Sequence, residues 1–240
     1  METTKKTKEM DMLNGGLAGK LILFSIPLAF SSILQQLFNS ADVAVVGRFA
    51  GDRALAAVGS CVALVGIFVN LIVGFSVGPN AVLANLIGQK RRDKINRMLH
   101  TIMAFGLIAG VILMGLGMLS AKPILEVSGT PESVMNEALL YIRIYFIGIP
   151  FMMIYNFGSA VLRSFGDTRR PMYYLILSGT VNVILNLILV IYFKLGVAGV
   201  AIATVISNIL SAGLVLIYLY RREDELSLIH ISEPTRPRLI

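Results

Sequence analysis

Six apolar blocks, each long enough to cross a bilayer as a helix, restrict the fold of this chain more than any other feature. A helix needs about 20 apolar residues to cross the roughly 30 Å hydrocarbon layer. The blocks cover residues 21–46, 54–77, 98–119, 139–162, 172–193 and 196–220. They lack the strict alternation of apolar and polar residues that marks the strands of a membrane barrel. We therefore predict an all-α membrane protein, a bundle of six transmembrane helices.

Composition supports a lipid environment and argues against several kinds of chemistry. Hydrophobic residues make up 56% of the chain, its mean hydropathy is +0.78, and 15% of its residues are charged, against about 25% in ordinary soluble domains. Cys61 is the only cysteine, and His100 and His230 are far apart in sequence. Zinc or thiol chemistry is therefore not expected. The sequence contains neither a nucleophile paired with a base nor a phosphate-binding loop, so an enzyme is not expected.

Lysine and arginine residues concentrate in alternate connections between the blocks. One set of connections holds Lys5, Lys6, Lys8, Lys20, Lys90, Arg91, Arg92, Lys94, Arg97, Arg163, Arg169, Arg170, Arg221 and Arg222. The other set holds only Arg48, Arg53, Lys122 and Lys194. Because basic residues near helix ends stay on the cytoplasmic side, we predict that both termini are cytoplasmic. The net charge of +7 follows from this asymmetry and does not indicate nucleic-acid binding.

Polar residues inside the blocks share helix faces. The stripes comprise Ser31, Gln35, Asn39 and Asp42 in the first block, Ser178, Asn182 and Asn186 in the fifth, and Thr204, Ser207, Asn208 and Ser211 in the sixth. Exposure of these groups to lipid is costly, so we expect the stripes to face one another or a water-filled cavity. Hydroxyl groups often only join helices. An intramembrane carboxylate must be protonated or paired, which makes Asp42 the strongest functional candidate.

Proline and glycine residues suggest where helices bend or end. Pro27 precedes Asp42 in the first block and removes a backbone hydrogen bond there. It is therefore predicted as a hinge that couples protonation of Asp42 to a change in the shape of the helix; a static kink is the alternative. Gly74, Gly78 and Pro79 are expected to end the second span. In the segment GDTRRP (166–171), we predict a cytoplasmic turn in which Gly166 ends one helix and Asp167 or Thr168 caps the next.

The last residues, LSLIHISEPTRPRLI (226–240), differ from the rest of the chain. One choice of codons for Leu226 to Arg236 reads as a transposase-based sequencing adapter translated in frame. We therefore expect the natural sequence to stop near Glu225 and assign no function to 226–240. A natural polar tail is the alternative, and resequencing of independent genomic DNA distinguishes the two.

Four segments occur together in the order found in one transporter family. They are IPLAFSSILQQLFNSADVAVVGRFAGDRALAAVG (26–59), LRSFGDTRRPM (162–172), VNVILNLILV (181–190) and LGVAGVAIATVIS (195–207). Over roughly residues 15–222, the chain resembles multidrug and toxic compound extrusion (MATE) transporters. The resemblance implies that residues 1–225 are the N-terminal lobe of a twelve-helix protein whose second, C-terminal six-helix lobe is missing here.

The family resemblance also implies an activity. Such transporters export small organic compounds, often cationic and amphipathic, across the plasma membrane of a prokaryote. The energy comes from inward flow of H⁺ or Na⁺, and no cofactor besides this ion is expected. The partners are then membrane lipid, the substrate and the missing lobe.

Residues carried over by motif coincide with the polar stripes. Asp42 matches the acidic cation-coupling position of the first helix, Asn182 and Asn186 match the fifth-helix pair, and Thr204 matches the sixth-helix hydroxyl; Asn156 is a looser match. Many family members have Asp where this chain has Asn186. Sodium binding at Asp42 remains possible, but loss of the second carboxylate favours H⁺ as the coupling ion. The residues predicted to line the cavity are Ser31, Gln35, Asn39, Ser178, Asn208 and Ser211.

Two other functions are compatible with the span pattern. A lipid-linked oligosaccharide flippase of the same superfamily would favour a strongly cationic cavity that holds a pyrophosphate. Only Arg143 is a basic candidate inside the spans, and it lies near an end. A channel or non-transporting scaffold is the third possibility, against which the stripe containing Asp42 argues.

Overall fold

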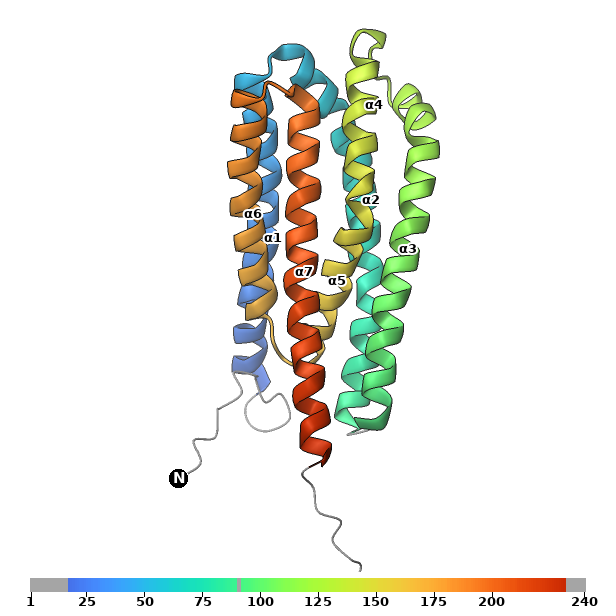
Figure 1. Ribbon diagram of the computed structural model, residues 1–240, viewed down its shortest axis with the longest axis vertical. Helices are drawn as coiled ribbons and strands as arrows, with labels where there is room; N and C mark the ends of the chain where they lie inside the picture. Colours follow the sequence, from blue (N-terminus) through green and yellow to red (C-terminus); the bar gives the residue numbers. More distant parts are fainter. Residues whose placement is uncertain (1–16, 90–91, 232–240) are drawn as a thin grey trace, which may run out of the picture.

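The computed structural model describes residues 17–89 and 92–231 and is an all-helical bundle in this part of the chain (Figure 1). The helices are α1 (Leu17–Phe49), α2 (Asp52–Gly88), α3 (Arg92–Val127), α4 (Glu132–Ile147), α5 (Ile149–Ser164), α6 (Arg169–Leu187), the π-helix η1 (Ile188–Tyr192) and α7 (Gly196–Ile231). Five of them are long and apolar enough to cross a membrane, and the bent pair α4–α5 makes a sixth span. The prediction of six spans is confirmed.

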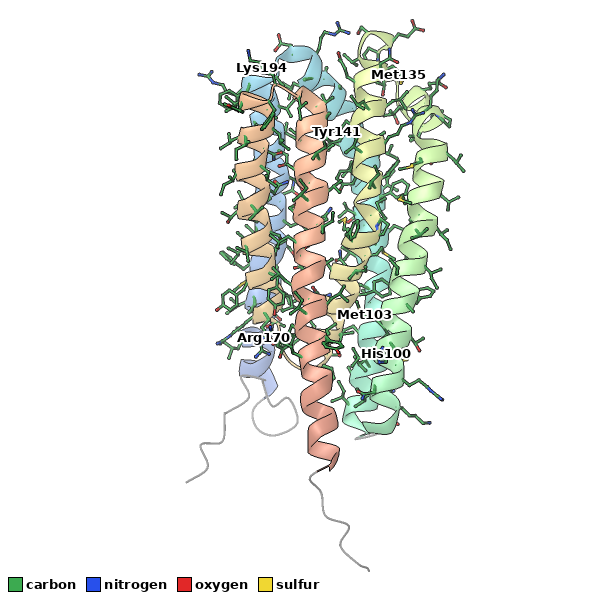
Figure 2. The ribbon with its side chains drawn as sticks, in the orientation of Figure 1. His100, Met103, Met135, Tyr141, Arg170 and Lys194 are labelled. Atoms are coloured by element: carbon green, nitrogen blue, oxygen red, sulfur yellow. The ribbon has the colours of Figure 1, made fainter. Side chains whose placement is uncertain are left out.

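The start of α1 and the end of α7 lie at the same end of the bundle, as an even number of spans requires (Figure 1). Figure 2 shows Lys194 at the opposite, predicted outer end, and Arg170 and His100 toward the predicted cytoplasmic end. Some residues used in the charge argument lie outside the described residues, namely Lys5, Lys6, Lys8, Lys90 and Arg91. Residues 232–240 of the predicted tail also lie outside them, while the backbone of α7 is helical through Ile231.

The span predicted as one helix over 139–162 is instead two helices that meet at an angle of 43°. The backbone N–H of Gly148 donates a hydrogen bond to the carbonyl of Tyr145, three residues earlier, at 2.9 Å. Pro150 follows at the start of α5 and has no N–H to continue the helical ladder, so the axis bends here. Gly110 of α3 packs against this bend, and a Cβ at Gly110 would lie 2.7 Å from Cα of Pro150.

Other predicted helix ends are also corrected. Gly74, Gly78 and Pro79 do not end the second span, because α2 continues through all three residues to Gly88. Proline is tolerated inside membrane helices where neighbouring groups replace the lost hydrogen bond. Helix α1 likewise runs unbroken through Pro27, whose carbonyl accepts a hydrogen bond from Oγ of Ser31 at 2.7 Å. The hinge role of Pro27 therefore stays a prediction.

Helix α7 lies centrally, with α6 and α1 on one side and α4 and α5 on the other (Figure 1). The largest fully buried side chains come mostly from α2, α4 and α5, among them Phe146 and Phe157. Helix α1 approaches α6 closely because Gly179 has no side chain, and a Cβ there would lie 2.1 Å from the ring of Phe38. This contact brings the polar stripe of α1 against that of α6.

Candidate functional site

Asp42 of α1 lies in a hydrogen-bonded cluster with residues of α6 and α7. Its Oδ1 accepts a hydrogen bond from Nδ2 of Asn186 at 2.5 Å, and its Oδ2 lies 3.4 Å from Oγ1 of Thr204. Nδ2 of Asn186 also donates to Oδ1 of Asn182 at 3.2 Å, and Nδ2 of Asn182 donates to Oγ1 of Thr204 at 3.4 Å. Helix α1 and the α6–α7 hairpin, which lies far from α1 in sequence, thus supply one network. We call it the Asp42 cluster (Asp42, Asn182, Asn186 and Thr204).

Helix geometry explains why these side chains meet. Asn182 and Asn186 are four residues apart, so they lie one turn apart on the same face of α6. Thr204 faces them from α7, and its hydroxyl lies 3.0 Å from the carbonyl of Val200. Asp42 is 8% exposed, Asn182 is 4% exposed and Asn186 is fully buried. The cluster is therefore shielded from lipid, as an intramembrane carboxylate requires.

A cavity of about 70 Å³ opens beside the cluster, between α1, α2, α4, α5, α6 and α7. The residues that line it are Gln35, Phe38, Asn39, Asp42, Val69, Tyr145, Met152, Tyr155, Leu175, Ser178, Gly179, Asn182, Thr204, Ser207, Asn208 and Ser211. Asp42 is the only charged side chain among them. Within the described ranges, no lysine or arginine makes an ion pair with Asp42.

Two residues of the predicted site lie elsewhere. Nδ2 of Asn156 donates to the carbonyl of Met152 at 2.8 Å, and the residue does not line the cavity. Ser31 bonds the backbone of its own helix and also lies outside the lining. The other five predicted lining residues are all at the cavity wall, namely Gln35, Asn39, Ser178, Asn208 and Ser211. Asn186 does not line the cavity itself but donates a hydrogen bond to Asp42, which does.

The aromatic part of the wall was not predicted from the sequence. Tyr145 lines the cavity from α4, and its ring centroid lies 6.2 Å from that of Tyr141 one turn away. Tyr155 lines it from α5 and donates its hydroxyl to the carbonyl of Pro171 at 2.9 Å. The tyrosine residues of the fourth block were the sequence signal that could have predicted this part of the wall. The bend between α4 and α5 brings one face of each helix to the cavity. This bend was not predicted from the sequence.

A profile of the family MatE matches residues 27–188 of this chain, which is more than half of its length. The chain belongs to the MatE family. Among MatE relatives, the Probable multidrug resistance protein YoeA of Bacillus subtilis (strain 168) is 33% identical over 208 residues, which are 85% of this chain and 45% of YoeA. The Probable multidrug resistance protein YpnP of the same organism is 31% identical over 234 residues, 96% of this chain and 51% of YpnP.

Solved structures of MatE proteins have the same arrangement of helices. A crystal structure of MATE in the bent conformation matches with a TM-score of 0.85 and 26% identity, and it covers 92% of this chain and 49% of that one. The chain thus spans about half the length of the MatE relatives that it matches. The match confirms the predicted resemblance and places the chain as a multi-pass membrane protein.

Proposed function

We propose that this MatE lobe belongs to a secondary active exporter of small organic cations, driven by inward flow of H⁺ or Na⁺, in the plasma membrane of a prokaryote. The observation that carries the proposal is the single carboxylate, Asp42, in a cavity otherwise lined by amides, hydroxyls, aromatic rings and uncharged apolar residues. The names of the relatives YoeA and YpnP, which refer to multidrug resistance, support a role in drug export.

Asp42 is proposed as the group that carries the coupling ion. A buried carboxylate without a cationic partner is stabilised when it binds a proton or a small cation. The amide of Asn186 suits both states, because it donates to the carboxylate through Nδ2 and would accept from the carboxylic acid through Oδ1 after a flip. That Oδ1 is buried and has no hydrogen-bond partner among the described residues. The hydroxyl of Thr204, between Asp42 and the carbonyl of Val200, can reverse its donation in the same way.

Proton coupling is favoured over sodium coupling. Sodium would be held by oxygen atoms of Asp42, Asn182, Asn186 and Thr204, which are hard ligands, but only one of them carries a full charge. A lone carboxylate offers less charge to a metal ion than a pair would. The donor groups that now face Asp42 are nitrogen or hydroxyl atoms, which suit exchange of a proton. The protein acts on its substrate by transport, and no reaction chemistry is proposed for it.

The flippase alternative fits the cavity less well. A lipid-linked pyrophosphate needs cationic groups around it, since phosphate groups are held by arginine or lysine. Among the described residues the cavity wall holds no lysine or arginine and one carboxylate. The electrostatic sign of the wall therefore favours a cationic substrate.

The test is Asp42→Asn in a full-length transporter that contains this lobe and its second lobe, reconstituted in vesicles with an imposed pH or Na⁺ gradient. The amide imitates the protonated carboxyl in shape and charge, so the variant should fold but lose gradient-driven dye export. Asp52→Asn is the matched control, because Asp52 is exposed at the outer start of α2. Export by Asp42→Asn at the wild-type rate under both gradients would refute the coupling role.

A second lobe is proposed to be required for transport. Alternating access in transporters built from repeats moves one half against the other around a central site. Vesicles that hold only the 240-residue chain should therefore show no ion-driven dye export. Coupled export by this chain alone would contradict the requirement.

A further inference from the structure

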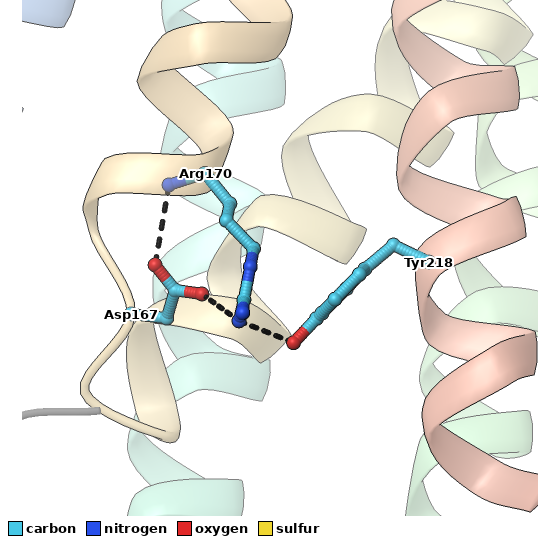
Figure 3. Close-up of polar contacts among 3 residues, drawn as sticks. All are labelled: Asp167, Arg170 and Tyr218. Carbon is cyan, nitrogen blue, oxygen red and sulfur yellow. Dashed lines mark hydrogen bonds and ion pairs between the residues drawn. The ribbon is translucent and has the colours of Figure 1, made fainter. Parts of the chain in front are cut away.

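Three residues at the cytoplasmic side of the bundle connect α6 to α7 (Figure 3). Oδ1 of Asp167 accepts a hydrogen bond from the backbone N–H of Arg170 at 3.2 Å, and Oδ2 accepts one from Nη1 of Arg170 at 2.5 Å. The same Nη1 donates to the hydroxyl of Tyr218, and the guanidinium carbon lies 4.4 Å from the centroid of the Tyr218 ring. We call Asp167, Arg170 and Tyr218 the cytoplasmic clasp.

The clasp is more than a cap on α6. Asp167 is only 5% exposed, so its carboxylate depends on Arg170 for charge compensation. The guanidinium of Arg170 combines a charged hydrogen bond, a hydrogen bond to a phenol and a cation–π contact, each of which fixes its orientation. Tyr218 belongs to the next helix, so the polar contact crosses between α6 and α7.

The clasp lies just beyond the cavity in the cytoplasmic direction. On α6 the wall extends from Leu175 to Asn182, and on α7 from Thr204 to Ser211. Along the helix axes, Arg170 is about 8 Å before Leu175 and Tyr218 is about 10 Å after Ser211. The cavity therefore separates the clasp from the Asp42 cluster.

The other end of the α6–α7 hairpin is closed by the chain itself. Lys194 and Gly196 turn the backbone with φ of 53° and 55°, and the N–H of Leu195 donates to the carbonyl of Leu189 at 3.1 Å. Between this turn and the clasp, Asn182 and Thr204 face each other at 3.4 Å, near the upper limit for a hydrogen bond. A small separation of the two helices would break that contact.

We propose that the cytoplasmic clasp positions the Asp42 cluster. By holding α6 against α7 on the far side of the cavity, it keeps Asn182 and Asn186 within reach of Thr204 and Asp42. Without the clasp, the hairpin opens about its outer turn, the donors withdraw from Asp42 and the cavity widens. The importance of this positioning for transport rests on the proposed coupling role of Asp42, whereas the geometric effect on Asp42 does not.

The experiment measures the reactivity of Asp42 in the 240-residue chain in lipid nanodiscs. Dicyclohexylcarbodiimide, an apolar reagent, modifies protonated carboxyl groups within membranes, and mass spectrometry gives the rate at Asp42. Tyr218→Phe removes only the hydroxyl, and Arg170→Gln removes the cation. Each should accelerate modification by about two- to thirtyfold, the range of couplings carried over such distances. The double variant should not exceed the larger single effect, because both act through one contact.

Controls separate positioning from general loosening. Arg169→Gln and Tyr220→Phe change the same chemical groups at exposed neighbouring positions and should leave the rate unchanged. The thiol of Cys61 is fully buried, so its reaction with a maleimide reports opening of the whole lobe. An unchanged Asp42 rate in Tyr218→Phe, or a rise that only parallels Cys61 reactivity, would overturn the proposal. Failure of the Asp42→Asn export test would remove the coupling role but would not alter these rates.

Discussion

Helix α3 packs against α4 and α5 through glycines and bulky side chains, whereas α1, α6 and α7 meet around amides, hydroxyls and one carboxylate. A Cβ at Gly106 would lie 3.1 Å from the ring of Phe157, and one at Gly117 would lie 2.9 Å from the ring of Phe146. Association of helices in lipid depends on such close packing, because lipid tails are as apolar as the side chains. On the other side, Asp42 is enclosed by polar groups.

The difference suggests a division of roles. The apolar side holds its helices by shape, and its contacts do not depend on the protonation of any group. The polar side contains the one carboxylate at the cavity wall and an amide oxygen, Oδ1 of Asn186, that has no hydrogen-bond partner in the part of the chain that the structure describes. Such a cluster can change its hydrogen bonds without repacking the apolar side. We therefore expect substitutions on the two sides to affect different measurements.

The largest effect on stability is expected for Gly110→Val on the apolar side. Its Cβ would lie 2.7 Å from Cα of Pro150, and backbone cannot move aside as a flexible side chain can. The free energy of unfolding should fall by about 1–3 kcal/mol or more, measured by circular dichroism during unfolding in mixed detergent micelles. Gly115→Val on the same helix is the control, because a Cβ there would have no described atom within 4 Å apart from its chain neighbours and the adjoining backbone of its own helix. Equal losses in both variants would mean that close packing at the bend does not stabilise the lobe.

An intermediate effect, on reactivity, is expected for Asn186→Ala on the polar side. The variant removes the amide that donates to Oδ1 of Asp42. A hydrogen bond to a charged group contributes about 1.5–3 kcal/mol, so carbodiimide modification of Asp42 should accelerate by about tenfold or more. Asn156→Ala should have little effect, because the amide of Asn156 bonds the carbonyl of Met152 instead. Equal acceleration by both variants would place Asn156 in the Asp42 cluster after all.

The smallest effect is expected for Asp42→Asn on folding. The new amide can still accept from Asn186 and donate to Thr204, and the buried charge is removed. The free energy of unfolding should therefore change by less than about 1 kcal/mol, in the same detergent assay. A loss comparable to that of Gly110→Val would show that the polar side also holds the fold together, and the contrast between the two sides would disappear.

The sequence by itself determined the membrane environment, the six spans and the polar faces of the first, fifth and sixth spans. These properties follow from apolar length and from the 3.6-residue period, which describe a helix about its own axis. The same reasoning singled out Asp42, because a carboxylate in lipid is costly wherever the neighbouring helices lie. The turn at GDTRRP could also be predicted, because a turn depends on neighbouring residues. Asp167, one of the two predicted caps, accepts a hydrogen bond from the backbone N–H of Arg170.

Only the tertiary structure decided which polar faces meet. Asn186 and Asn156 are the same residue type in neighbouring spans, yet one contacts Asp42 and the other bonds its own helix. The bend at Gly148 and Pro150 sets how α4 and α5 face the cavity, and the contact of Arg170 with Tyr218 joins positions 48 residues apart. Helical periodicity gives no information about the rotation and depth of one helix relative to another. Those are set by packing between helices, such as Phe38 against Gly179.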